Sequence, residues 1–391
     1  MSFALKKYKL GDLMDVTRGA SLAGEHYATE GDLIRLTLGN FDYDNCGFKV
    51  NTSKDNIYYT GDVNESFILN EGDVITPLTE QTPGLLGTTA RIPESGKYIQ
   101  SQDIALIKCK PELLDRDYAY YLLPSKLVKE QLAARAQQTK IRHTSPDKIK
   151  DCTVFVPSVE EQKKIAAVLC SIDDRIKICR KICNQLEDIA RSLYNFYFNN
   201  IQVPQTDWRK SIVEDEFDVL FGFPFSTELF TEEVTDKPVI RIRDILTRTI
   251  SAYSKEDVDI KYLLEESDLL VGMDGIFHMN LWDGKKAFLN QRSARVRQKN
   301  DITTKHLLYQ IYPYIKAKEA QAKGSTVGHL SNDEIRQLPI TIPPIDILQE
   351  FNSKIVPLVK LQLHTSRSIE ELLELRNWIL PILMNGQMSI N

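Results

Sequence analysis

The stretch IRHTSPDKI at residues 141–149 returns as VGHLSNDEI at residues 327–335, with His, Ser, Asp and Ile in the same four places. Each copy runs into a hydrophobic segment that ends at a proline, Pro157 or Pro344, and a glutamine stands five positions after each proline. An echo of this length predicts that the chain contains one structural unit twice.

Further echoes lie upstream of this phrase. ILNEGDVITP (68–77) resembles LLEESDLLVG (263–272), LIRL (33–36) resembles VIRI (239–242), and SQDIALIK (101–108) resembles NQRSARVR (290–297). A period close to half of the 391 residues indicates two similar domains and not a solenoid of many short repeats.

Composition places the chain among globular proteins. It has 42% hydrophobic residues, enough for two sizeable cores. No apolar run approaches the roughly 20 residues of a membrane helix, and the N-terminus lacks the apolar core of a signal peptide. We therefore expect a cytoplasmic protein.

The cysteines do not predict a disulfide framework or a metal centre. The six residues include no CxxC pair, which fits a reducing compartment. Cys179 and Cys183 are one helical turn apart, but no third ligand stands near them, so buried thiols are favoured over a metal site. We expect neither a metal nor a cofactor.

Positive charge gathers late in each repeat although the whole chain carries a net charge of −5. Residues 121–150 hold seven Lys or Arg against two acidic residues, and residues 285–323 hold ten against two. Either stretch alone would be read as a solvated helix face, but their recurrence favours a nucleic-acid surface, because the phosphate backbone responds to the local field.

The order of local patterns predicts α+β domains. Each half begins with about 110 residues of short β-like runs broken by turn signals. A helical segment follows, at 117–136 and at 305–322, and then comes the repeated His phrase.

After Pro157 the pattern becomes that of a coiled coil. Apolar residues spaced alternately by three and four positions continue for more than four heptads, and a helix of about 40 residues would be about 60 Å long. A similar series with three polar members follows in the second half. The two seams are Ile165, Leu169, Ile172, Ile176, Cys179, Cys183, Leu186, Ala190, Leu193 and Tyr197, and Phe351, Ile355, Leu358, Gln362, Thr365, Ile369, Leu372, Arg376, Ile379 and Leu383.

These seams predict that the two helices pair with each other. Polar seam positions fix register, so a specific partner is expected, and an antiparallel pairing would relate the two domains by a pseudo-twofold axis. The alternative is two separate helices, each packed on its own domain.

Motifs of catalysis are missing from the sequence. It contains no GxxxxGK[ST], GxGxxG, HExxH or GxSxG motif. His143 and His329 recur in the repeat without a nucleophile and base arrangement, so we interpret them as residues that orient a loop. The sequence therefore favours a recognition protein over an enzyme.

At motif level the chain resembles the specificity subunit of Type I restriction-modification enzymes. The similar stretches are GFPFSTELF (222–230), PVIRIRDI (238–245), MDGIFHMNLWDGKKAFLNQR (273–292), GSTVGHLSNDEI (324–335) and PSVEEQKKIAAVL (157–169). The first repeat departs from the pattern, because it has Gln138-Thr139-Lys140 where the second has Gly324-Ser325-Thr326.

The resemblance implies two target-recognition domains at 1–157 and 201–343 and two spacer helices at 158–200 and 344–391. It also implies a non-catalytic subunit that reads a split double-stranded DNA target and docks two methyltransferase subunits, which motor-nuclease subunits join. Donors and acceptors in loops would read base edges, and basic residues would contact phosphates. The candidate DNA-binding residues are Thr79, Glu80, Gln81, Thr82, Gln138, Thr139, Lys140, Arg142, His143, Asp274, Phe277, His278, Lys323, Ser325, Thr326 and His329.

Two alternatives remain from other classes of protein. A stand-alone DNA-modifying enzyme would need a catalytic domain with a cofactor loop, and no segment is left for one. A coiled-coil adaptor that binds only proteins would not need the paired basic stretches, and a DNA shift assay would identify it.

Overall fold

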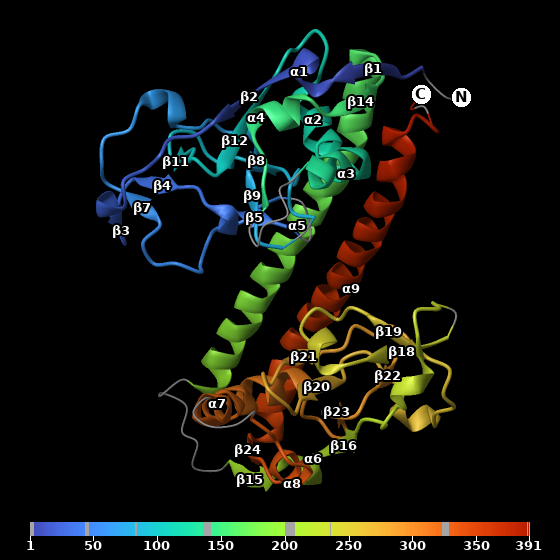
Figure 1. Cartoon of the computed structure of the whole chain (residues 1–391). Helices are drawn as coiled ribbons and strands as arrows, with labels where there is room; N and C mark the ends of the chain where they lie inside the picture. Colours follow the sequence, from blue (N-terminus) through green and yellow to red (C-terminus); the bar gives the residue numbers. More distant parts are fainter. Residues whose placement is uncertain are drawn as a thin grey trace. The chain divides into compact units, whose positions relative to one another are not determined.

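The computed structural model describes residues 4–43, 47–82, 84–135, 142–199, 208–234, 236–322, 328–388 and 390. The chain forms two compact units: unit 1 comprises residues 1–175 and 373–391, and unit 2 comprises residues 176–372 (Figure 1). Both boundaries fall inside long helices, α5 (Val159–Phe198) and α9 (Ile345–Met384). Each unit therefore contains one copy of the repeat together with part of both helices.

Unit 1 is built around two four-stranded sheets and three short strand pairs. The first sheet is antiparallel, in the order β10 (Ala90–Arg91), β8 (Val74–Pro77), β12 (Ile104–Cys109), β2 (Met14–Arg18). The second has the order β11 (Tyr98–Ile99), β4 (Leu33–Arg35), β7 (Tyr58–Tyr59), β3 (Tyr27–Ala28), with β11 and β4 parallel. The pairs are β1 (Lys6–Lys9) with β14 (Thr153–Val156), β9 (Thr79–Glu80) with β13 (Arg142–His143), and β5 (Phe41–Asp42) with β6 (Gly47–Phe48).

Unit 2 repeats this arrangement with fewer short strands. Its antiparallel sheet has the order β16 (Phe217–Phe221), β23 (Ser293–Gln298), β20 (Leu269–Gly272), β21 (Met279–Leu281). Its mixed sheet has the order β17 (Phe230–Thr231), β19 (Ala252–Ser254), β18 (Lys237–Ile240), β22 (Phe288–Leu289). The terminal pair is β15 (Arg209–Ile212) with β24 (Pro339–Ile342).

Backbone hydrogen bonds confirm the duplication at residue level. The amide of Gly19 donates to the carbonyl of Ile104 in unit 1, and the amide of Gly222 donates to Ser293 in unit 2. Likewise, the amide of Leu78 donates to the carbonyl of Asp103, and in unit 2 these positions are Met273 and Arg292. The echoes in the sequence therefore mark equivalent positions of the two sheets.

The repeated His phrase is a helix start in both units. In α4 (Pro146–Lys150) the hydroxyl of Ser145 accepts from the amide of Lys148 at 3.2 Å, and in α8 (Asn332–Arg336) Ser331 caps the helix in the same way. The repeated isoleucines, Ile149 and Ile335, are both buried. The Ser and Ile of the phrase therefore recur because they form the cap and the core contact of the same short helix.

The remaining helices differ in one respect from the sequence prediction. The sequence predicts a helical segment at 117–136, and the structure divides it into α2 (Arg116–Leu122) and α3 (Lys126–Arg135), on either side of Pro124. In contrast, α7 (Thr304–Ala322) continues through Pro313. The other helices are the single turns α1 (Leu10–Leu13) and α6 (Val213–Glu216).

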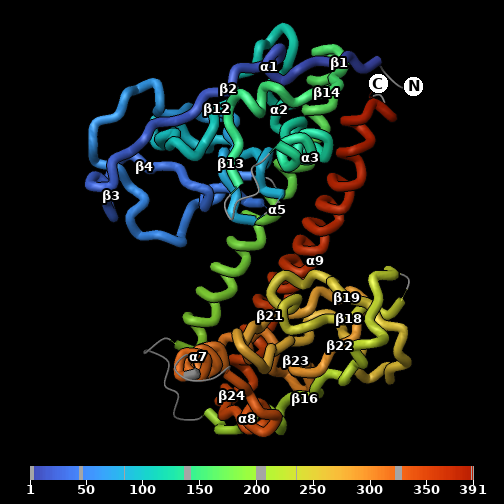
Figure 2. The backbone as a smooth tube through the Cα atoms, viewed as in Figure 1, coloured from blue at the N-terminus to red at the C-terminus, as the bar shows by residue number. Residues whose placement is uncertain are grey.

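In unit 1 the start of α5 packs with the end of α9. Ile165 and Leu169 share one core with Leu383, and Arg376 Nη1 donates to Asp173 Oδ1 at 3.1 Å. Figure 2 shows the end of α9 beside the start of β1. Leu5 before β1 and Leu380, Pro381, Met384 and Asn385 at the end of α9 line a common pocket. The C-terminal helix thus completes the core of the first repeat.

In unit 2 the end of α5 packs with the start of α9. Tyr197 donates to the Glu350 carboxylate at 2.6 Å, and Gln362 Nε2 donates to the carbonyl of Cys183 at 3.3 Å. Because the higher-numbered α5 residue meets the lower-numbered α9 residue, the two segments run antiparallel. The predicted pairing of the two helices within one chain is confirmed.

Within the described ranges, no helix combines the length and apolarity that a bilayer span needs.

Candidate nucleic-acid interface

In unit 1 the candidate interface centres on the β9–β13 pair. Arg142 lies opposite Glu80 in this pair, and His143 lies opposite Thr79. Glu80 is only 1% exposed, and its Oε2 accepts hydrogen bonds from the amides of Leu85 and Leu86 at 2.7 and 2.9 Å. The buried Glu80 carboxylate therefore fixes the backbone of the loop that follows β9.

The residues next to Glu80 face outward. Gln81, Thr82 and His143 are exposed, and Arg142 is partly buried with its Nη1 3.8 Å from Glu80 Oε1. The pair thus presents amide, hydroxyl, imidazole and guanidinium groups on one edge, where Glu80 fixes the backbone beneath them.

In unit 2 the equivalent place holds a three-residue cluster. Asp274 forms an antiparallel bridge with His329, as Thr79 pairs with His143 in unit 1. The Asp274 carboxylate contacts His329 Nδ1 through Oδ1 at 2.5 Å and accepts from Arg292 Nη1 through Oδ2 at 2.5 Å. One carboxylate therefore orients both an imidazole and a guanidinium.

The electrostatics of this cluster favour an ionised Asp274. Partial burial alone would raise the pKa of its carboxyl, but the hydrogen bonds from His329 and Arg292 outweigh burial and hold the pKa below its usual value. Arg292 itself has φ of 68°, which a residue with a side chain adopts at a cost of about 1 kcal/mol or more. A strained backbone held by a charged partner is typical of functional sites.

The other predicted residues have different environments. The Phe277 side chain is fully buried in the unit 2 core, and its amide donates to Glu319 Oε2 at 3.0 Å, while His278 is half-buried. In this conformation the Phe277 ring packs inside the unit and does not reach its surface. Six predicted residues lie outside the described residues: Gln138, Thr139, Lys140, Lys323, Ser325 and Thr326.

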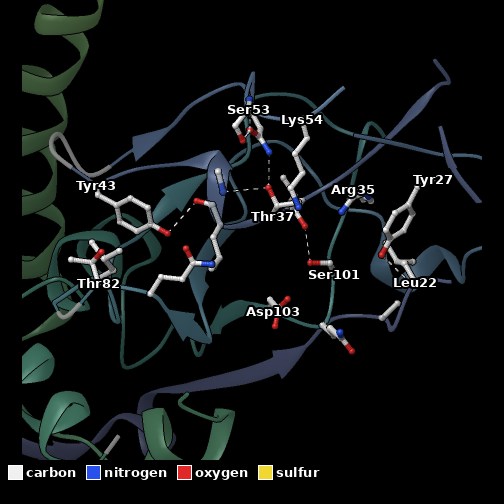
Figure 3. Close-up of a pocket in the computed structure, with 18 residues that line it drawn as sticks. Leu22, Tyr27, Arg35, Thr37, Tyr43, Ser53, Lys54, Thr82, Ser101 and Asp103 are labelled. Carbon is white, nitrogen blue, oxygen red and sulfur yellow. Dashed lines mark hydrogen bonds between the residues drawn. The ribbon is translucent and has the colours of Figure 1, made fainter. Parts of the chain in front are cut away.

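A polar pocket of about 500 Å³ adjoins the β9 loop in unit 1 (Figure 3). The guanidinium of Arg35 lies 3.8 Å from the centre of the Tyr27 ring and donates to the carbonyl of Asn56 at 2.9 Å. The pocket could not be recognised in the sequence, because distant segments form it, although Arg35 belongs to a repeated phrase. Its polar lining includes Tyr27, Arg35, Thr37, Lys54, Gln81, Thr82, Ser101 and Asp103.

The helix seam is a core feature in both units. Most of its predicted apolar members are buried, but Leu358 is half-buried while its neighbours Val359 and Leu363 are buried, so the α9 stripe in unit 2 is shifted by one position there. Buried members are Ile165, Leu169, Ile172, Ile176, Leu186, Ala190, Tyr197, Phe351, Ile355, Thr365 and Leu383, and the other half-buried apolar members are Cys179, Cys183, Leu193, Ile369, Leu372 and Ile379.

A polar network accompanies the seam in unit 2. Lys305 Nζ lies 2.6 Å from Glu187 Oε2, and Gln362 and Tyr309 donate to the same carboxylate at 3.2 and 2.9 Å. Burial would raise the pKa of Glu187, but the charge of Lys305 and these hydrogen bonds lower it. The polar seam residue Gln362 therefore ties α5, α7 and α9 together. No group of described His, Cys, Asp or Glu residues could hold a metal ion.

Comparisons with known proteins show which family this chain resembles. A family model described as the Type I restriction modification DNA specificity domain matches residues 4–188 and again 205–374. The specificity subunit of the Type I restriction enzyme EcoBI from Escherichia coli is 29% identical over 157 residues, 40% of this chain and 33% of that subunit. The MjaIX specificity subunit of Methanocaldococcus jannaschii is 24% identical over 315 residues, 70% of this chain and 69% of that subunit.

A solved structure shares the fold. The crystal structure of the S subunit of the Type I restriction-modification system from M. genitalium superposes with a TM-score of 0.66 at 15% identity, and the match covers 97% of this chain and 96% of that one. The two matches of the family model coincide with the two copies of the repeat. The chain therefore belongs to the specificity-subunit family of Type I restriction-modification systems.

Proposed function

We propose that this chain is the DNA-reading subunit of a Type I restriction-modification complex and that each repeat reads one half of a split target. The observation that carries the proposal is the recurrence of one surface in both units: a loop after β8 or β20 paired with the His phrase, at Thr79 and His143 or at Asp274 and His329. A split target needs two readers, and a duplicated domain supplies them.

The proposed DNA contacts follow from exposure and chemistry. Gln81, Thr82 and His143 in unit 1 carry donors or acceptors that base edges can pair with, and His329 and His278 do so in unit 2. Arg142 and exposed lysines of both late segments, such as Lys126 and Lys286, would contact phosphates. Glu80 and Phe277 support these loops from inside, as their burial requires.

The domain bounds remain part of the proposal. Residues 1–157 and 201–343 would be the two readers, and residues 158–200 and 344–391 would be the helices whose length sets the spacer between the half-sites. The observation that α5 is one continuous helix from Val159 to Phe198 supports its role as a spacer.

The same helices would dock two methyltransferase subunits, and motor-nuclease subunits would join the full complex. An apolar stripe on α5 supports docking: Ile178, Ile182, Ile189 and Phe196 are exposed on the helix, each one position before a seam residue. Exposed apolar stripes of this length mark protein interfaces. A cytoplasmic location, where DNA is accessible, belongs to this proposal.

Mixing experiments test the function. The purified chain should transfer no methyl group alone, whereas the complex with its methyltransferase should methylate DNA specifically. The chain should also shift DNA in a manner that weakens as salt rises. Methyl transfer by the isolated chain would support a stand-alone enzyme, and a complex that binds proteins but never DNA would support an adaptor.

A further inference from the structure

The cluster in unit 2 presents hydrogen-bond donors to solvent. Arg292 and His329 are 61% and 57% exposed at their side chains, whereas the Asp274 carboxylate that joins them is 22% exposed. With Nδ1 on the carboxylate, the imidazole leaves Nε2 for an outside partner, and Arg292 keeps further N–H groups beyond the one given to Asp274. Such a cluster would bind an acceptor-rich partner.

The backbone beneath the cluster is well fixed. Gly275 donates its amide to the carbonyl of Gly328, and Leu330 donates to Met273, so the β20 loop and the His phrase are joined on both sides of the Asp274–His329 bridge. Because the loops and the carboxylate are both held, the two donors keep their positions before any ligand arrives.

Unit 1 has the opposite chemistry at the same place. The carbonyls of Asp103 and Arg292 accept the equivalent hydrogen bonds from Leu78 and Met273, so Asp103 is the counterpart of Arg292. An acceptor thus replaces a donor. Thr79 replaces Asp274, so unit 1 lacks the carboxylate that holds the imidazole.

Asp103 also lies near Gln81 and Thr82, the proposed DNA-contacting residues after β9 in unit 1. It lines the polar pocket together with Gln81 and Thr82, the exposed residues after β9 (Figure 3). No hydrogen bond or ion pair engages its carboxylate among the residues that the structure describes, and the side chain is only partly buried. Its oxygens are therefore available to an incoming donor.

We infer that position 103 in unit 1 and position 292 in unit 2 are equivalent specificity-determining positions with opposite preference. Arg292 recognises the acceptor edge of a guanine, O6 and N7, with His329 beside it. Asp103 accepts from an exocyclic amino group, cytosine N4 or adenine N6. These are the base groups that a guanidinium and a carboxylate match in the major groove. The inference rests on the proposed DNA-reading function and names the residues that carry it.

In this scheme Asp274 is a positioning residue. It touches no base and acts by fixing Arg292 and His329. Asp274→Asn removes the charge that fixes these two side chains. It should therefore reduce discrimination at the same base position as Arg292→Gln, by a smaller factor, and leave the other positions unchanged.

The test uses the complex of the full chain with its methyltransferase, and the readout is the methylated motif found by sequencing a host genome. Arg292→Gln should reduce discrimination for one guanine in one half-site by roughly 10- to 100-fold. Asp103→Asn should relax one position in the other half-site. Lys255→Gln removes the charge of an exposed lysine in unit 2 and should leave the motif unchanged.

The outcomes separate the inference from the proposed function. If Arg292→Gln lowers methylation at all sites equally and keeps the motif, Arg292 contacts only phosphate and the inference is overturned while DNA reading stands. The inference is also overturned, while DNA reading stands, if Arg292→Gln and Asp103→Asn alter the same half-site. It is overturned likewise if the position that Arg292→Gln alters is not a guanine. A wild-type complex without any split motif would refute the proposed function itself. Unchanged melting temperatures show that the variants fold.

Discussion

Acidification should destabilise unit 2 through one buried histidine, His306. This side chain is 1% exposed, and its ring centroid lies 5.4, 4.3 and 5.9 Å from those of Tyr194, Phe198 and Phe351. Within the described residues neither ring nitrogen has a hydrogen-bond partner. Burial in this apolar cage lowers the pKa of His306 from 6.5 to about 3.

The sign follows from proton counting. Between pH 6.5 and about 3 the unfolded chain binds a proton at His306 that the folded chain does not bind. Unfolding therefore takes up a proton, and the free energy of unfolding falls as the pH falls, by about 1.4 kcal/mol for each pH unit. Between pH 7 and pH 5 this contribution is about 2 kcal/mol.

The control is His306→Leu, which keeps a side chain of similar size and removes the titration. Both proteins would be unfolded in urea at pH 7, 6 and 5, with Trp208 and Trp378 replaced by Phe so that fluorescence reports on Trp282, a buried residue of unit 2. The parent should lose about 2 kcal/mol more than the variant between pH 7 and pH 5. Equal losses would refute the reasoning, because other titrating groups are common to both proteins.

Substitutions at three positions test the packing. Gly222→Ala would place a Cβ 1.9 Å from the carbonyl oxygen of Asn290, so unit 2 should lose about 3 kcal/mol of unfolding free energy in urea denaturation. Lys305→Met should cost about 2 kcal/mol, since it removes the closer of the two ion pairs of the partly buried Glu187 and leaves only Arg191 at 3.6 Å, and Lys305→Arg should recover much of this. Ile172→Asp should lower the melting temperature of unit 1 and abolish co-purification with the methyltransferase, because an unpaired carboxylate would enter the buried seam; a stable, assembled variant would contradict the seam.

Patterns within short segments predicted the fold well. The repeated phrase predicted the duplicated helix because Ser145 and Ser331 cap it and Ile149 and Ile335 are buried beneath it. Local chemistry and tertiary packing therefore agree at this phrase. The helix seam was readable in α5, since its period is a property of the sequence, but in α9 the buried stripe moves from Leu358 to Val359. The break at Pro124 was missed because a proline can end a helix or be tolerated inside one, as α7 shows, and only the surrounding packing decides.

The site was less readable because its parts are distant in sequence. Glu80 was expected at the surface from its position in a polar loop, yet two backbone amides, Leu85 and Leu86, satisfy its carboxylate inside the unit. Arg292 stood in a matching stretch but was not singled out, because its relation to Asp274 and His329 exists only after three segments meet. Its alignment with Asp103 was the one signal in the sequence that could have marked it.

The most direct test of the central claim is the pattern of methylated bases in the genome of a host that carries this chain with its methyltransferase. Two readers of different chemistry predict one motif made of two unlike specific half-sites separated by a spacer of fixed length and unspecified sequence. A single continuous motif, or methylation without sequence preference, would contradict the claim that each repeat reads its own half of the target.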